Sequence, residues 1–196
     1  VNHGENTEGI YYNMPMFRKA GLPVPWQPKT WSDIIDAAKK IKATNPGVWP
    51  VWLQGGTAGG TTSLQYNGAN LIAGSSNPTI FDPQSKKWVV DSPGLRESLQ
   101  FYSDLAKNGL QAPPAQLLNP NAVVNAMSLG AKQKFAIAIN GNFFGSSWAK
   151  GTCSPCWAAG PKVYGAAQMP TVQGTAQPNI ASALGGWELS VGAGTQ

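Results

Sequence analysis

Residues 9–41 read GIYYNMPMFRKAGLPVPWQPKTWSDIIDAAKKI, and this stretch decides the fold class. Its residues 10–12 are β-branched or aromatic, which favours a buried strand. Residues 22–28 hold three prolines, which forbid a continuous helix and keep the connector extended. Thr30 lies three residues before Asp33, the spacing of a helix N-cap. The helix predicted to follow has one apolar face, formed by Trp31, Ile34, Ile35, Ala38 and Ile41.

The rest of the chain alternates helical patterns with short apolar segments, which indicates an α/β layer fold in one compact unit. We predict strands at residues 48–53, 134–140, 163–167 and 187–191, and a hairpin with arms at 80–81 and 88–90. We predict helices at residues 62–73, 92–109 and 141–148, and one that starts at 119–120. Residues 55–60 read as a plain glycine-rich connector without the ending of a phosphate-binding loop.

Two expectations concern the hydrophobic core. The buried face of the helix at 92–109 is expected to consist of Leu95, Leu99, Tyr102, Leu105 and Ala106. Among the tryptophans, we assign three to the core, namely Trp31, Trp49 and Trp88.

The composition excludes two classes of partner. The chain has 196 residues, which is enough to bury one core. Charged residues make up 12% of it, about half the usual share of roughly 25%. The net charge of +5 comes from basic residues scattered along the chain, without the basic, aromatic-interleaved stripe that nucleic-acid binding needs. No apolar run approaches the roughly 20 residues that span a bilayer.

The two cysteines, Cys153 and Cys156, form a CSPC motif. A metal site would need two more ligands nearby, and the single histidine, His3, lies far away in the sequence. A thioredoxin-like centre would stand at a helix start after a strand, whereas this motif stands between Gly151 and Gly160. We expect a short disulfide in an exported protein, with two free thiols as the alternative, and no metal or cofactor.

Five segments of the chain carry a resemblance to a known family. They are residues 11–42 with YYN, KAGL, TW and AKK, then 101–110 (FYSDLAKNGL), 135–143 (FAIAINGNF), 164–170 (YGAAQMP) and 185–191 (GGWELSV). Together they resemble the extracellular solute-binding proteins of ABC importers. The likeness is to the large group that captures sugars, with maltose-binding protein as a distant relative.

The resemblance implies an α/β lobe from a two-lobed, periplasmic-binding-protein-like fold, with a mixed sheet flanked by helices. Residues 1–196 would be the second lobe, with the first lobe and the final helices absent; a naturally short protein is the alternative. It further implies a monomeric, non-enzymatic receptor that is extracellular or periplasmic and membrane-tethered at full length. Its partners would be a sugar or oligosaccharide and the transmembrane subunits of an ABC permease.

The ligand site is expected to combine aromatic rings, which stack on sugar faces, with amide or carboxylate groups, which bond hydroxyls. We favour Trp187, because Gly185 and Gly186 before it let the backbone approach closely; core packing is the alternative. Phe143 occupies a position where the family often stacks an aromatic ring, although Phe144 could face the cleft instead.

Five further residues are candidates by their place in the chain. Asn142 could donate to a ligand hydroxyl or cap a short helix. One of Asn6 and Glu8, where the chain would cross between lobes, can reach the ligand, although Glu8 reads rather as a solvated hinge residue. Tyr66 and Trp148 are weaker candidates.

Enzyme readings fit poorly, so we predict no catalytic residues. Glycoside hydrolysis needs two carboxylates across the sugar ring. Glu8 and Glu188 are the sole conceivable pair, and strand alternation turns Glu188 away if Trp187 faces the cleft. Two rivals stay open: the same fold with another small polar solute, and a secreted carbohydrate-active enzyme or lectin-like module.

Overall fold

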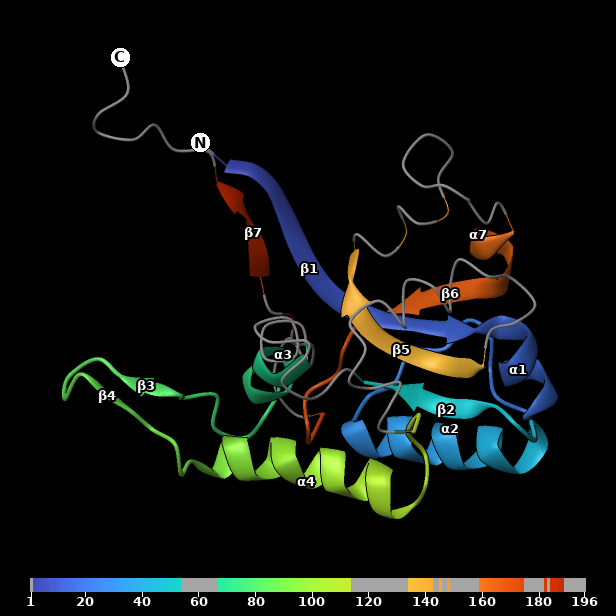
Figure 1. Ribbon diagram of the computed structural model, residues 1–196, viewed down its shortest axis with the longest axis horizontal. Coiled ribbons are helices and arrows are strands. Elements are labelled where there is room, and N and C mark those ends of the chain that lie inside the picture. Colours follow the sequence, from blue (N-terminus) through green and yellow to red (C-terminus); the bar gives the residue numbers. More distant parts are fainter. Residues whose placement is uncertain are drawn as a thin grey trace.

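The fold is given by a computed structural model, which describes residues 2–53, 67–113, 134–142, 159–174 and 184–188, with Gly145, Trp148 and Ser182 (Figure 1). The helices are α1 (Met14–Lys19), α2 (Trp31–Thr44), α3 (Ala69–Ala73), α4 (Pro93–Lys107) and α7 (Gly160–Val163). The strands are β1 (Asn2–Asn13), β2 (Trp49–Trp52), β3 (Phe81–Asp82), β4 (Lys87–Trp88), β5 (Phe135–Gly141), β6 (Tyr164–Ala167) and β7 (Leu184–Glu188).

Strand β1 is the centre of the main sheet. The strand order is β2-β5-β1-β6, and β7 also pairs with β1. β1 runs antiparallel to β5, β6 and β7, whereas β2 runs parallel to β5. Helices α2 and α4 lie along one side of this sheet (Figure 1). The predicted mixed sheet with flanking helices is therefore confirmed.

β1 changes partner along its length. Its first part pairs with β7, and Thr7 lies opposite Leu184. From the next residue onward it pairs with β5, and Glu8 lies opposite Gly141. The two-stranded part, residues 2–7 with β7, extends away from the helices (Figure 1). We call this part the β1–β7 ribbon.

The main core lies between the sheet and helix α2. Alternate residues of β1, Ile10 and Tyr12, are buried in it, as strand geometry requires. The Tyr12 hydroxyl accepts a hydrogen bond from the backbone N–H of Trp26 at 3.0 Å. The rings of Tyr12, Phe17 and Trp26 lie 4.8–5.6 Å apart, centroid to centroid. The proline-rich connector is thereby fastened to the sheet.

The opposite face of the sheet carries a smaller apolar cluster. Trp52 and Ala138 lie opposite each other on β2 and β5, and both are buried there. Trp148 and Tyr164 complete the cluster with nearly parallel rings, 5.6 Å apart. Both faces of the sheet are therefore covered with apolar side chains.

Helix α2 forms as its sequence predicts. The Thr30 side chain accepts a hydrogen bond from the Asp33 N–H, and the Asp33 carboxylate accepts one from the Thr30 N–H. Four of the five residues of the predicted apolar face are buried, and Ile35 is half-buried. Trp31 lies in the core and donates its indole N–H to the Pro170 carbonyl at 3.0 Å.

The predicted buried face of helix α4 is wrong in part. Leu99 is 59% exposed and Ala106 is exposed. Leu105 is buried as predicted, and the helix also buries Gly94, Ser98 and Phe101. Ser98 tolerates burial because its hydroxyl donates to the Gly94 carbonyl at 2.8 Å. Counting apolar residues along the helix does not predict the burial of Ser98 and Gly94, because it ranks leucine above serine and glycine.

The assignment of Trp88 to the core is also wrong, since its side chain is 69% exposed. The predicted hairpin exists, but β3 and β4 have two residues each and project from the body of the molecule (Figure 1). Trp88 packs edge-on against Phe81, with centroids 5.2 Å apart. Trp49 is half-buried beside the second cluster, with the Lys134 ammonium 5.7 Å from its ring centroid.

Several predicted elements are placed only in part. The predicted helix at 62–73 appears as α3, and its first residues lie outside the described ranges. β7 begins three residues before the predicted strand, whose last residues also lie outside them. The connector at 55–60, the helix from 119–120 and half of the residues 141–148 lie outside as well. In the part of the chain that is described, no helix has the length and hydropathy of a bilayer span.

Replacing Thr30 with alanine should lower the free energy of unfolding by about 1 kcal/mol, because the Asp33 N–H loses its capping acceptor. Thr44→Ala in the last turn of the same helix is the matched control. We expect it to change stability by less than about 0.5 kcal/mol, since alanine is the better helix former. Urea unfolding followed by circular dichroism measures both. Equal losses would show that the cap does not stabilise α2.

Replacing Gly165 with alanine should destabilise the fold by about 1–3 kcal/mol through overpacking. An added Cβ would stand 2.5 Å from a Tyr12 ring carbon, and that ring is held by the Trp26 N–H. Gly145→Ala is the control, since no atom of the described residues lies within 4 Å of its added Cβ. Thermal unfolding by calorimetry compares the two variants. A Gly165→Ala protein as stable as the control would contradict the packing argument.

Candidate functional site

The junction between the ribbon and the sheet holds the most unusual polar group of the described chain, Glu8. Its backbone N–H donates to the Ser182 hydroxyl at 2.8 Å. The same hydroxyl lies 3.1 Å from the Glu8 carbonyl and donates to it. Ser182 lies two residues before the first residue of β7. Its side chain therefore gives Glu8 a hydrogen-bonded partner just where the backbone pairing of β1 with β7 stops. The backbone of Glu8 is therefore fixed.

The Glu8 side chain is buried, with 7% of the residue exposed. Its Oε2 has no hydrogen-bond partner among the residues that the structure describes. Loss of hydration raises the pKa of this carboxyl to about 8, because burial penalises the charged form. The expectation of a solvated hinge residue is therefore wrong. Near neutral pH the group is mostly a neutral carboxylic acid, which can both donate and accept hydrogen bonds.

Tyr11 links this junction to the end of β5. Its hydroxyl donates to the carbonyls of Gly141 and Asn142 at 3.3 and 3.5 Å. Burial, and secondarily the nearby charge of Glu8, raise the pKa of the Tyr11 hydroxyl to about 12. The Tyr11 ring meets Trp148 edge-on at 5.8 Å. The phenol therefore stays protonated and acts as a fixed donor at the point where β5 ends.

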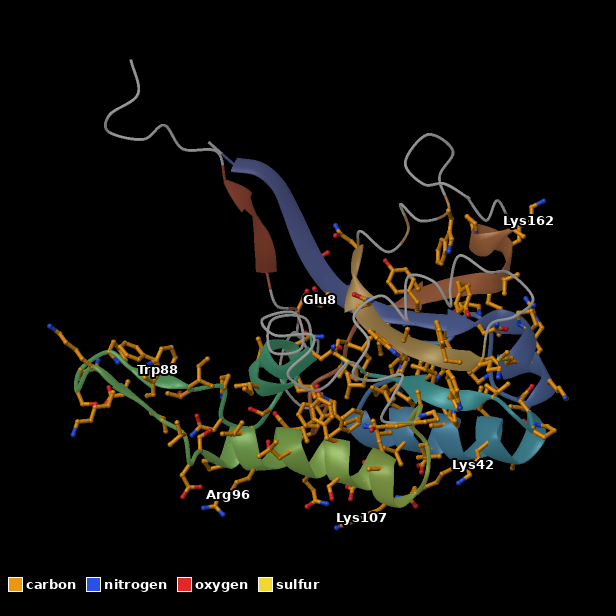
Figure 2. The ribbon with its side chains drawn as sticks, in the orientation of Figure 1. Glu8, Lys42, Trp88, Arg96, Lys107 and Lys162 are labelled. Carbon is orange, nitrogen blue, oxygen red and sulfur yellow. The ribbon has the colours of Figure 1, made fainter. Side chains whose placement is uncertain are left out.

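Three of the predicted site residues can be placed around this junction. Glu8 lies at its centre (Figure 2). Asn142 is exposed directly after β5, and its carbonyl accepts from Tyr11. Trp148 is 9% exposed and stacks on Tyr164 in the second cluster. Its ring is thus largely covered in this structure, and its contact with a ligand stays a prediction.

The remaining predicted residues are placed by backbone alone or not at all. On the ribbon, Asn6 lies opposite Gly185, while Gly186 and Trp187 lie opposite Glu5 and Gly4. Asn6 is thus two residues from Glu8 along β1, whereas Gly186, opposite Glu5, lies farther out on the ribbon. The others lie outside the described residues, namely Tyr66, Phe143, Phe144, Cys153 and Cys156.

Sequence reasoning missed Tyr11 and Ser182. Tyr11 had a signal, because strand alternation puts it on the face opposite Ile10 and Tyr12, where its hydroxyl needs a partner. Ser182 had none, since it reaches Glu8 across 174 positions of sequence.

The described chain also has a cavity that lies away from this junction. A cavity of about 380 Å³ lies between α2 and α4, with an apolar floor that includes Trp31 and Phe101 and a rim that includes Arg96 and Asp104. Figure 2 shows Arg96 on α4, away from Glu8. Within the described ranges, no group of three or more metal-ligating side chains comes together.

Solved structures of similar fold cover nearly the whole chain. An ABC-transporter solute-binding protein from Thermotoga lettingae, bound to α-D-tagatose, is 29% identical, with a TM-score of 0.68. The match covers 95% of this chain and 43% of that one. A solute-binding protein from Agrobacterium vitis with bound D-mannitol is 25% identical over 94% of this chain and 42% of its own, with a TM-score of 0.66. A cyclic maltosyl-maltose-binding protein from Arthrobacter globiformis shares the fold at 22% identity, with a TM-score of 0.69 over 95% of this chain and 41% of its own.

Curated relatives match a shorter part of the chain. The sn-glycerol-3-phosphate-binding periplasmic protein UgpB of Agrobacterium fabrum is 32% identical over 106 residues, 51% of this chain and 22% of the relative. The protein of the same name from Brucella abortus is 34% identical over 107 residues, 51% of this chain and 23% of its own length. The chain thus spans less than a quarter of these relatives and less than half of the solved structures named above.

The sequence profile of one family covers almost the entire chain. The family described as bacterial extracellular solute-binding protein matches residues 3–196. The mixed sheet and the solved relatives agree with that match. This chain belongs to the bacterial extracellular solute-binding protein family.

Proposed function

We propose that this chain is one lobe of a two-lobed receptor that captures a carbohydrate or sugar alcohol and delivers it to an ABC importer. The observation that carries the proposal is the match to solute-binding proteins that hold tagatose and mannitol, each over at least 94% of this chain. Each match covers about two-fifths of the solved protein, 43% and 42%. A match to about two-fifths of each solved protein is the share expected of one lobe in a two-lobed protein.

The ribbon supports the proposal of a second lobe. A two-stranded ribbon that leaves the sheet cannot bury both of its own faces, so it is stable when further protein packs around it. β1 and β7 extend beyond the helices in this way (Figure 1). The two lobes would then close over a solute held near the Glu8 junction. Closure follows from the difference in ligand affinity between the open and closed forms.

A second candidate ligand is sn-glycerol 3-phosphate or a similar small polar solute. The observation that favours it is the name of the curated relatives, which are 32–34% identical over half of this chain.

The rest of the proposal concerns the cellular setting. The family is extracellular, and the curated relatives are periplasmic. We place this receptor outside the cytoplasmic membrane, tethered to it at full length, as a monomer that meets the transmembrane subunits of a permease. The family and the solved relatives are binding proteins, and we assign no catalytic role.

Residues 1–196 alone should bind any sugar at least roughly 100-fold more weakly than the intact receptor, because one lobe supplies part of the contacts. A thermal-shift screen of the intact receptor against neutral sugars and sugar alcohols identifies the ligand, since binding raises the unfolding temperature. Titration calorimetry then compares the receptor with residues 1–196. An affinity of residues 1–196 within about tenfold of that of the intact receptor would contradict the proposal of a single lobe.

A further inference from the structure

The hairpin of β3 and β4 carries most of the large apolar side chains that are exposed in the described part of the chain. Four of the five lie on it or beside it, namely Ile80, Phe81, Trp88 and Val90. The hairpin projects from the body of the molecule (Figure 1), and Figure 2 shows Trp88 on it, away from Glu8. We propose that this hairpin contacts the surface of a lipid bilayer with anionic headgroups. The inference goes beyond the proposed function and does not depend on which solute is captured.

Three of these side chains share one face of the hairpin. Phe81 lies opposite Trp88 in the antiparallel register, so both rings project from the same side, with centroids 5.2 Å apart. The Val89 N–H donates to the Ile80 carbonyl at 2.9 Å, which continues the pairing by one more residue. Val90 comes two residues after Trp88 and therefore belongs to the same face. The exposed fractions on this face are 41% for Phe81, 69% for Trp88 and 77% for Val90.

The turn end of the hairpin carries two cations. Lys86 and Lys87 are exposed, and neither forms an ion pair with any described residue. Lys86 has a φ of 56°, in the left-handed region that glycine or asparagine usually occupies. Within the described residues its side chain makes no hydrogen bond that would offset this conformational cost. A lysine at this turn is therefore not explained by the folding of the hairpin.

The nearby carboxylates are already bonded within the protein. Asp82 is half-buried and accepts hydrogen bonds from the Gln84 N–H and the Ser85 hydroxyl. Asp91, at the base of the hairpin, forms an ion pair with Arg96. The charges that the hairpin presents outward at its turn are therefore those of the two lysines. An approaching surface of negative charge complements them.

A lipid surface fits this set of side chains better than a protein does. Tryptophan is enriched at the boundary between headgroups and hydrocarbon, and lysine can extend its apolar stem toward a headgroup phosphate. A stable protein–protein interface takes about 20–30 residues a side, and strands of two residues each cannot supply them. A bilayer needs no such shape complementarity. A second copy of the chain is disfavoured, because each copy has a net charge of +5.

The contact is expected to be weak and reversible. Two lysines and three apolar side chains reach only the headgroup region. A single myristoyl chain, with a membrane affinity of about 10⁴ M⁻¹, is an upper bound. Such a hairpin does not anchor a protein by itself. In a receptor that is tethered to the membrane, as proposed above, it would fix the orientation of this lobe relative to the bilayer.

Vesicle co-sedimentation at low ionic strength tests the inference on the intact receptor, prepared without a membrane tether. The receptor should sediment with vesicles of equal parts phosphatidylcholine and phosphatidylglycerol, remain in solution with phosphatidylcholine alone, and be released by salt. Replacing both Lys86 and Lys87 with glutamine should lower partitioning at least about fivefold. Lys107→Gln with Lys162→Gln is the matched control, since both lysines are exposed and lie away from Trp88 (Figure 2). We expect it to lower partitioning less than about twofold.

The apolar face is tested by fluorescence. The difference between the emission spectra of the receptor and of Trp88→Phe isolates the signal of Trp88. This signal should be quenched by acrylamide in solution, and it should shift to the blue and become protected when the mixed vesicles are added. Trp88→Ser should lower partitioning at least about threefold, whereas Leu99→Ala, which removes an exposed apolar side chain on α4, should not.

Three results would overturn the inference. Equal partitioning of the two double-lysine variants would show a general attraction of a basic protein, without a role for the hairpin. An unchanged Trp88 signal on bound receptor would show that the hairpin does not enter the headgroup region. Protection of Trp88 from acrylamide before any lipid is added would show that other protein covers it. Circular dichroism melting should be the same for all variants, because the changed side chains are exposed, so that lost binding is not lost folding.

Discussion

The continuous hydrogen bonding of strand β1 is the constraint on which the structure depends. Its twelve residues pair in turn with β7, β5 and β6, so one register fixes the ribbon and the sheet together. A shift of one residue would exchange the two faces of β1. Ile10 and Tyr12 would leave the main core, and Glu8 would no longer lie opposite Gly141. The place of the acidic group is thus fixed by the same pairing that buries the aromatic rings.

What the sequence could predict was determined by local interactions. Helix α2 followed from Thr30 and Asp33, because a capping box closes within four residues. The hairpin of β3 and β4 followed from a turn within nine residues, and β5 was recognisable as a central strand by its apolar run. The family resemblance, which the profile match confirms, came from motifs spread over most of the chain.

What the sequence could not predict depends on contacts between distant segments. Trp88 looks like a core residue until the hairpin is seen to project from the body. The burial of Gly94 follows from the nearness of Asn77, whose carbonyl leaves no room for a side chain. The burial of Glu8 has no signal in its sequence neighbours, because its exposed fraction is 7% at a position where β1 changes from β7 to β5. Long-range packing also decides hydration, and hydration decides the pKa of a carboxyl group.

The hydroxyl of Ser182 bears on how the molecule can flex. It bonds both polar groups of the Glu8 backbone where β1 exchanges β7 for β5, so the strand has no unsupported peptide at that point. A hinge motion at Glu8 would have to break these two hydrogen bonds before the strand could bend there. The regular pairing of β1 with β7 is interrupted farther out, where the register shifts between Asn2 and Gly4, so the irregular part of the strand lies away from the sheet.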